Sequence, residues 1–395
     1  MVRLFIGLLV MALMIGPTRA EIFQGERLVS YDGKPALVRF FPGSRGRPLV
    51  VLTPGGGTTA RLFYGVHRDR RPEDFLATHL TAFGYNVLAV SIPIDTGDPV
   101  FAEPHPGFTI RDWGDVLANA AAEVVAEHRL DPKVILVGWS MAGKSAHPMA
   151  TAAPAHGIEV GLFVSLAATP PVLGVLPIEE SYPMNAETGY GQAPDPEYKG
   201  ALWNLRANAR ANGVEQLIPP QEYIAHYVGE GPVGVSHTGL RHRDGAIIGD
   251  LSADIEDGQG YDFAGFPPVA TIVPTTRHDL RHAMTDLHTW GMITTNRIYQ
   301  TRLKPAGQAL RKMSPADYVR LRELVLQVPS RLSVDIDGNH FFFVGEKGAR
   351  QTAEAIARLE AEARVVEQDL DDLLTTEEET EPKQTNASAA RPSPG

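Results

Sequence analysis

The chain has 395 residues, of which 43% are hydrophobic and 21% charged, and its formal net charge is −11 at pH 7. This length allows a large buried core, and the acidic balance argues against a nucleic-acid-binding surface. The sequence contains no cysteine, which excludes disulfides, thiol chemistry and cysteine-ligated metal sites.

The first 20 residues have the pattern of a secretory signal peptide. Arg3 precedes an apolar run over residues 4–16, and Thr18-Arg19-Ala20 is a small-x-small cleavage site. The apolar run is too short for the roughly 20 residues that a bilayer-spanning helix needs, so cleavage after Ala20 is favoured over an uncleaved anchor. We therefore expect an exported protein, periplasmic or secreted, without stable membrane insertion after cleavage.

The first half of the mature chain alternates strand and helix patterns. Residues 27–41 alternate polar and apolar side chains around Asp32-Gly33, which predicts an antiparallel hairpin. Continuous apolar runs predict buried strands at 48–53, 86–92, 134–137 and 159–166, and helical spacing predicts helices at 75–83, 109–128 and 145–153. Uninterrupted apolar strands between helices are typical of a mostly parallel sheet covered on both faces, an α/β fold.

The second half begins with an irregular segment. Residues 171–266 are rich in Gly, Pro and Tyr, with one helical stretch at 202–211, and we interpret them as an inserted lid or cap over a site. Its aromatic side chains are expected to shape a pocket: Tyr182, Tyr190, Trp203, Tyr223 and Tyr227.

Further strands and helices complete the predicted domain. Strands are expected at 268–273 and 331–336, and helices at 286–298, 315–328 and 351–363. Residues 366–395 begin with an acidic run and end in small polar residues, which predicts a disordered acidic tail. The domain itself then spans residues 21–365.

One stretch fits two chemistries. Strand 134–137 is followed by G-W-S-M-A-G at 138–143, the strand–turn–helix arrangement of a nucleophile elbow centred on Ser140. Gly138 to Ser145 also matches the phosphate-binding loop G-x-x-x-x-G-K-S. A nucleotide site needs a strand ending in Asp to hold Mg²⁺, and the strands at 86–92 and 159–166 do not supply one. We favour the elbow, with Lys144 as a surface residue.

Two later residues complete a nucleophilic site with Ser140. Asp279 follows the strand at 268–273, and His340 follows the last strand. Because ligand sites of parallel sheets lie at the carboxyl ends of the strands, the chain order Ser, Asp, His predicts a catalytic triad.

The acid of this triad has rivals. Asp286 and the pair Glu256-Asp257 are alternatives, and Asp279 could instead cap the following helix.

The glycines after the strand at 48–53 predict an oxyanion hole. A tetrahedral intermediate needs backbone N–H donors, one from the residue after the nucleophile, here Met141. The other donor is expected from the run Gly55-Gly56-Gly57, where glycine lets an amide turn inward; we favour Gly56, then Gly57.

These motifs resemble the α/β-hydrolase superfamily, of the serine esterase kind. The resemblance covers about residues 27–365 and rests on P-G-G-G at 54–57, G-W-S-M-A-G at 138–143 and D-G-N-H at 337–340. Pro54 stands where many esterases have His, and Ala142 replaces the second elbow glycine. The long interval between Asp279 and His340 predicts an extra helical insertion between the last two strands.

The resemblance implies an α/β-hydrolase fold and a serine hydrolase that cleaves small carboxylic esters through an acyl-enzyme, without a cofactor. An amidase or peptidase on the same triad, and a catalytically inactive binding protein, are the alternatives. His278, His282 and His288 could suggest zinc, but no Glu completes an H-E-x-x-H motif, so a metal site is not expected. Nothing in the sequence indicates the natural substrate or the oligomeric state.

Overall fold

A computed structural model of the protein describes residues 22–192 and 195–375. The expected signal peptide and residues 376–395 of the expected tail lie outside the described residues. Within those residues, no helix has both the length and the apolar character needed to cross a membrane.

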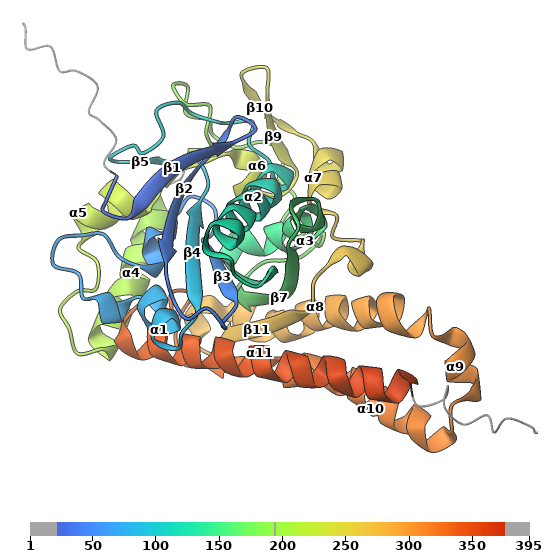
Figure 1. The fold of residues 1–395 in the computed structure, drawn as a ribbon. Coiled ribbons are helices and arrows are strands. Elements are labelled where there is room, and N and C mark those ends of the chain that lie inside the picture. The colour runs from blue at the N-terminus through green and yellow to red at the C-terminus, as the bar shows by residue number, and fades with distance from the viewer. Residues whose placement is uncertain (1–21, 193–194, 376–395) are drawn as a thin grey trace, which may run out of the picture.

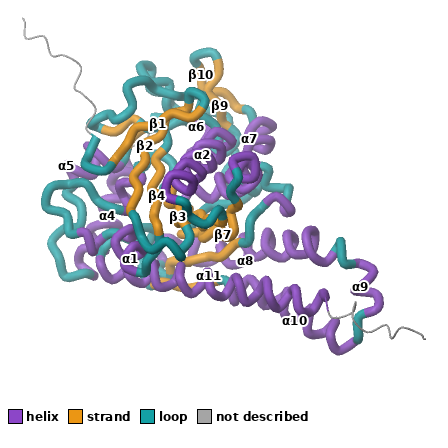
Figure 2. The backbone as a smooth tube through the Cα atoms, viewed as in Figure 1, coloured by secondary structure: helices purple, strands orange, loops and turns teal. Residues whose placement is uncertain are grey.

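An eight-stranded sheet forms the centre of the molecule (Figures 1 and 2). Its strands, given in spatial order, are β1 (Glu26–Tyr31), β2 (Lys34–Phe41), β4 (Asn86–Ser91), β3 (Leu49–Thr53), β6 (Lys133–Trp139), β7 (Glu159–Leu166), β11 (Val269–Pro274) and β12 (Ser333–Ile336). The hairpin β1–β2 and its pairing with β4 are antiparallel, and the pairs from β4 to β12 are all parallel. The predicted hairpin, buried strands and α/β architecture are confirmed.

The central strands β3, β4, β6, β7 and β11 are buried on both faces of the sheet, which explains their continuous apolar sequences. In β3, Val50 and Leu52 belong to one core cluster whereas Leu49 and Val51 belong to the other, because successive side chains point to opposite faces. The core containing Leu49 is completed by α2 (Ile110–His128) and α3 (Ala146–Ala152). The core containing Val50 is completed by α1 (Leu76–Ala82), α10 (Pro315–Arg331) and α11 (Glu346–Thr375).

The segment between β7 and β11 carries several short elements. They are α4 (Asp195–Ala211), α5 (Pro220–Glu222), β8 (Gly229–Glu230), α6 (Val233–Ser236), the hairpin β9 (Leu240–Arg243) and β10 (Ala246–Gly249), and α7 (Leu251–Gly258). Strand β8 pairs with β5 (Asp95–Thr96), and the Gly229 amide donates to the Gly57 carbonyl at 2.9 Å. The segment predicted as a lid is thus attached to the loop that follows β3.

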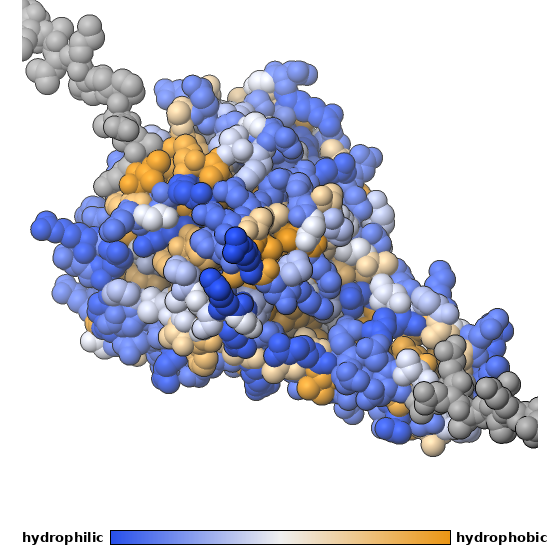
Figure 3. Space-filling model, viewed as in Figure 1, coloured by the Kyte–Doolittle hydropathy of each residue, from blue (hydrophilic) through white to orange (hydrophobic). Residues whose placement is uncertain are grey.

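A helical arm extends from the body (Figure 1). It comprises α8 (Leu280–Ile298), α9 (Gly307–Lys312) and α10 (Pro315–Arg331), all between β11 and β12, together with the end of α11 (Glu346–Thr375). This confirms the predicted helical insertion. The face drawn in Figure 3 is mainly hydrophilic, consistent with apolar side chains being concentrated in the two cores.

The predicted start of the acidic tail, residue 366, is wrong, because α11 continues to Thr375. Two of its apolar side chains, Val366 and Leu370, are buried in the core cluster that contains Val50. The acidic side chains between them form ion pairs with arginines. Arg302 pairs with Glu367 at 2.5 Å and Arg331 pairs with Asp369 at 3.0 Å, so arginines of the arm neutralise a segment whose composition alone suggests disorder.

Candidate active site

The turn after β6 holds Ser140 in an unusual backbone conformation. Its φ is 56°, in the left-handed region that non-glycine residues adopt at a cost of about 1–3 kcal/mol. A short 3₁₀ helix, Ser140–Ser145, follows and leads into α3. A Cβ on Gly143 would lie 2.4 Å from the Thr169 carbonyl oxygen, so Gly143 provides the close approach of backbones that an elbow requires. Ala142, which replaces the usual elbow glycine, is fully buried.

The loops after β11 and β12 bring a carboxylate to a histidine. His340 Nδ1 donates to Asp279 Oδ2 at 2.7 Å, and their side chains are 22% and 10% exposed. Burial by itself raises the pKa of Asp279, but the hydrogen bond and the positive charge available on His340 outweigh it and hold the pKa below its ordinary value. The Asp279 side chain makes no capping bond to α8, so its carboxylate is directed at His340.

The other candidate acids have different partners. Asp286 bonds to His282, and burial raises its pKa to about 8. Asp257 pairs with Arg241 at 2.8 Å, and Glu256 is exposed. Of the acids proposed from the sequence, Asp279 is therefore the one that reaches His340.

Ser140 and His340 line a common cavity of about 430 Å³. No hydrogen bond joins the two side chains in this arrangement; such contacts are often loose until substrate binds. Ser140, Asp279 and His340 follow the carboxyl ends of β6, β11 and β12, in that order along the chain. These strands belong to a mostly parallel sheet that has helices on both faces. The fold is an α/β-hydrolase fold.

Similarity to known proteins is found among solved structures. No family model and no curated protein sequence matches the chain. Among solved structures, it is similar to an esterase from Thermogutta terrifontis (12% identity, 86% of this chain and 98% of that chain, TM-score 0.42). It is also similar to a membrane phospholipase A (13%, 86% and 86%, 0.43) and to the thioesterase domain of a curacin biosynthetic pathway (13%, 84% and 98%, 0.37). At these values the similarity supports no conclusion about this chain.

The glycine loop of this α/β-hydrolase fold faces Ser140. A Cβ on Gly55 would lie 2.8 Å from Ser140 Cβ and 3.5 Å from the Met141 nitrogen, whereas one on Gly56 would lie 2.5 Å from Ser236 Oγ. Gly56 and Gly57 line the cavity, and Gly57 has a positive φ of 72°. Gly55 therefore makes the close approach to Ser140, and the two glycines favoured from the sequence form the adjoining wall.

The cavity wall also comes from the segment between β7 and β11. Tyr182 and Tyr223 line the cavity together with Ser236 and His237. Of the other aromatic residues expected there, Trp203 borders a different cavity, and Tyr190 and Tyr227 are buried. The expectation of an aromatic pocket therefore applies to two of the five residues.

Trp139, which precedes Ser140, and two asparagines that the sequence did not single out support the His340 loop. Trp139 Nε1 donates to the His340 carbonyl at 2.8 Å, and the two rings lie 5.0 Å apart. Asn339 Nδ2 donates to Asn208 Oδ1 at 2.9 Å, and Asn208 Nδ2 donates to the Phe341 carbonyl at 2.7 Å. Helix α4 thus fastens the loop on both sides of the histidine. No sequence motif marks these asparagines, because their partners lie more than 130 residues away.

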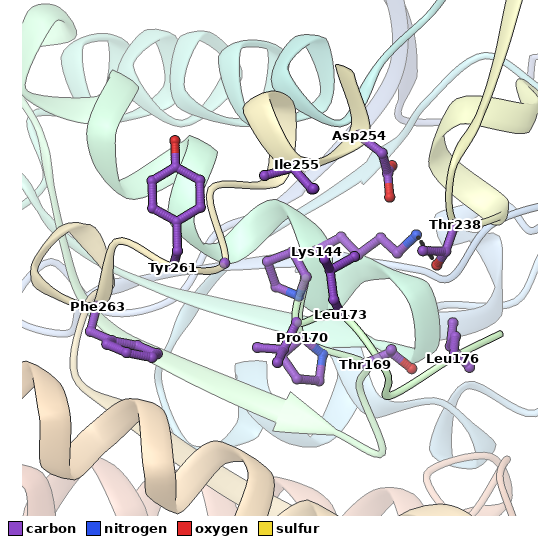
Figure 4. A pocket seen from close by; sticks show the side chains of 13 residues that line it. Lys144, Thr169, Pro170, Leu173, Leu176, Thr238, Asp254, Ile255, Tyr261 and Phe263 are labelled. Atoms are coloured by element: carbon purple, nitrogen blue, oxygen red, sulfur yellow. Dashed lines mark hydrogen bonds between the residues drawn. The ribbon is translucent and has the colours of Figure 1, made fainter. Parts of the chain in front are cut away.

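The expected surface position of Lys144 is wrong. Its side chain is 2% exposed and borders a separate cavity of about 270 Å³ (Figure 4). The Lys144 ammonium donates to the His237 carbonyl at 2.9 Å and to Thr238 Oγ1 at 3.3 Å, and burial lowers its pKa to about 8. Ser145 is also buried and donates to the Ala142 carbonyl. Both residues that a phosphate loop would direct at a nucleotide are therefore engaged inside the protein.

One group among the described residues has the spacing of a metal site. It consists of Asp279, His282 and His340, with potential ligand atoms within 4.8 Å of one another. Each already has a hydrogen-bond partner, and the Arg281 guanidinium lies 2.5 Å from His282 Nε2, where a cation would be repelled. This group differs from the histidines at 278, 282 and 288 considered from the sequence, and its contacts fit a proton-transfer site better than a cation site.

Proposed function

We propose that the protein is a serine hydrolase that cleaves carboxylic esters through an acyl-enzyme. The observation that carries this proposal is the combination of a strained Ser140, at φ 56°, with the Asp279–His340 pair at one cavity. Strain of this kind persists only where surrounding contacts maintain it, and it concentrates at functional sites.

In this mechanism His340 accepts the hydroxyl proton of Ser140 as the oxygen attacks the ester carbonyl. The tetrahedral intermediate carries its negative charge on the former carbonyl oxygen, which the amides of Met141 and of the glycine loop, Gly56 in first place, would bind. Collapse breaks the bond to the alcohol, which leaves with the proton from His340. Water then attacks the acyl carbon while His340 takes one of its protons. Collapse breaks the bond to Ser140, which receives that proton from His340, and the carboxylic acid is released. No cofactor is required.

Asp279 has two roles in this scheme. As a hydrogen-bond acceptor it holds His340 with the proton on Nδ1, which leaves Nε2 free to act as base toward Ser140. As an ionised group it stabilises the imidazolium that forms during each step. Its lowered pKa supports this, because the carboxylate stays charged at neutral pH.

Two alternatives keep the same fold. An amidase or peptidase would use the same residues and differ only in its leaving group. A binding protein without catalysis would keep the cavity but not an activated serine. Neither is favoured by a specific contact, and each is separated from the proposal by the experiment below.

The experiment is labelling with a fluorophosphonate, followed by mapping of the adduct and a screen of p-nitrophenyl esters against matched anilides. We expect one adduct, on Ser140, and turnover of esters well above anilides. Labelling should disappear in His340→Ala and persist in Ser252→Ala, which changes an exposed serine of α7. Folded protein without an adduct would reject the proposal in favour of a binding role, and equal or faster anilide turnover would favour the amidase.

The expectation of export is also a proposal. It rests on the signal-like residues 1–20 alone. Sequencing the N-terminus of protein recovered outside the cytoplasm should show a chain beginning at Glu21.

A further inference from the structure

A second histidine–aspartate pair lies directly beside the first. His282, on α8, is 2% exposed, and its ring is stacked on that of His340, with centroids 5.1 Å apart and planes inclined by 29°. Its Nδ1 lies 2.9 and 3.0 Å from the two carboxylate oxygens of Asp286, which is equally buried. The scheme proposed above does not use this pair.

The contacts of His282 determine its protonation. Arg281 donates to His282 Nε2 at 2.5 Å, and a guanidinium can only donate, so Nε2 must carry a lone pair. The single ring proton is then on Nδ1, directed at Asp286. The charged or titratable groups facing this ring are Asp279, Arg281, Asp286 and His340, and burial together with the positive charges lowers the pKa of His282 to about 2. His282 is therefore a neutral ring with one tautomer.

The same network reaches the nucleophile. Arg281 donates to Thr169 Oγ1 at 2.8 Å, and the Thr169 amide donates to the Ser140 carbonyl at 2.8 Å. Thr169 is 1% exposed, so water does not compete strongly for these bonds. A continuous path of contacts thus runs from the His340 ring through His282, Arg281 and Thr169 to the backbone of the elbow.

We propose that His282, held by Asp286 and Arg281, is a positioning residue that sets the ring plane of His340 relative to Ser140. This inference rests on the proposed serine hydrolase activity. A neutral His282 adds no charge beside the imidazolium formed in each step, whereas a charged ring would repel it. The hydrogen bond to Asp279 leaves His340 free to rotate about the line joining the two groups, and stacking on His282 restricts that rotation.

The test compares three variants. His282→Asn keeps a donor for Asp286 but removes the ring, and Asp286→Asn keeps the side-chain volume but replaces one carboxyl oxygen with an NH₂ group. His288→Asn is the matched control, because His288 is an exposed histidine of the same helix. Each variant is assayed for kcat and KM with p-nitrophenyl acetate, for the rate of fluorophosphonate labelling, and for its thermal unfolding midpoint.

For His282→Asn we expect kcat to fall about 10- to 100-fold, the loss typical of a misoriented catalytic group, with KM within twofold. Labelling of Ser140 should slow by the same factor. Asp286→Asn should lose about 3- to 10-fold in kcat, and His288→Asn should match the wild type. The proton between His340 and Asp279 should give a low-field NMR signal that broadens in His282→Asn. If His282 contributed to stability alone, the line width of this signal would not change.

Folded His282→Asn with kcat within threefold of wild type would overturn the proposal. Should that variant not fold, Asp286→Asn decides, and an unchanged kcat there overturns it equally. Wild-type protein that neither labels at Ser140 nor hydrolyses esters would instead refute the proposed function. If the wild-type protein is active and the variants have the same kcat as the wild type, only the role of His282 is refuted.

Discussion

Replacing Asp279 with Asn tests the proposed site most directly. The carboxylate accepts from His340 Nδ1 at 2.7 Å, and its side chain is only 10% exposed. Two unit charges about 4 Å apart interact by about 4 kcal/mol at an effective dielectric constant of 20, a value suited to partly buried pairs. Stabilisation of the imidazolium in the transition state by this amount corresponds to about three powers of ten in rate.

We therefore expect Asp279→Asn to lower kcat at least 10³-fold, because the amide also permits the wrong tautomer of His340. The assay is kcat for a p-nitrophenyl ester at pH 7.5. Asp279 has a lowered pKa, so its stabilising contribution is complete above its unfolded value near 4 and is lost only as the pH falls through the folded value. The control is Asp335→Asn, an exposed aspartate of β12. A loss below tenfold in folded Asp279→Asn would refute this reasoning.

Three further changes test separate features. Gly55→Ala should lower kcat more than tenfold, because its Cβ would lie 2.8 Å from Ser140 Cβ; Gly107→Ala, which meets no neighbour within 4 Å, should not. Leu370→Ala should lower the free energy of unfolding by about 2–4 kcal/mol, against under about 0.5 kcal/mol for half-exposed Val365→Ala. Lys144→Met should change how stability depends on pH. In the folded protein the pKa of Lys144 is lowered from 10.5 to about 8, so between these pH values the unfolded chain binds more protons than the folded one. The free energy of unfolding of the wild type, relative to that of the variant, should therefore rise by about 3 kcal/mol from pH 8 to pH 10.5.

The first two comparisons use kcat and urea unfolding, and the third uses urea unfolding at a series of pH values. An active Gly55→Ala would mean that the glycine loop can move away from Ser140. An unchanged free energy of unfolding in Leu370→Ala would mean that residues 366–375 do not contribute to the folded core. A stability difference independent of pH would mean that Lys144 stays charged inside the protein.

The strands and most helices were predictable because their signals are local. Apolar runs bounded by Gly and Pro identified β6 and β11, and the chain order placed Ser140, Asp279 and His340 at strand ends. The features that escaped prediction depend on partners distant in sequence. Lys144 can be buried because a carbonyl and a hydroxyl some 90 residues later accept hydrogen bonds from its ammonium group. The end of α11 is helical because arginines of the arm neutralise its carboxylates, which composition alone does not reveal.

The insertion between β11 and β12 has a consequence for how the chain folds. Asp279 and His340 are 61 residues apart, and closing a loop of that length costs about 3.5 kcal/mol of chain entropy. His340 is tied in turn to Trp139, 201 residues earlier. The proposed site is therefore assembled from long-range contacts, whose entropy cost must be offset by the packing of the intervening helices. In a partly folded chain Ser140 would have no base to activate its hydroxyl. We therefore expect a reactive serine only in the completely folded protein.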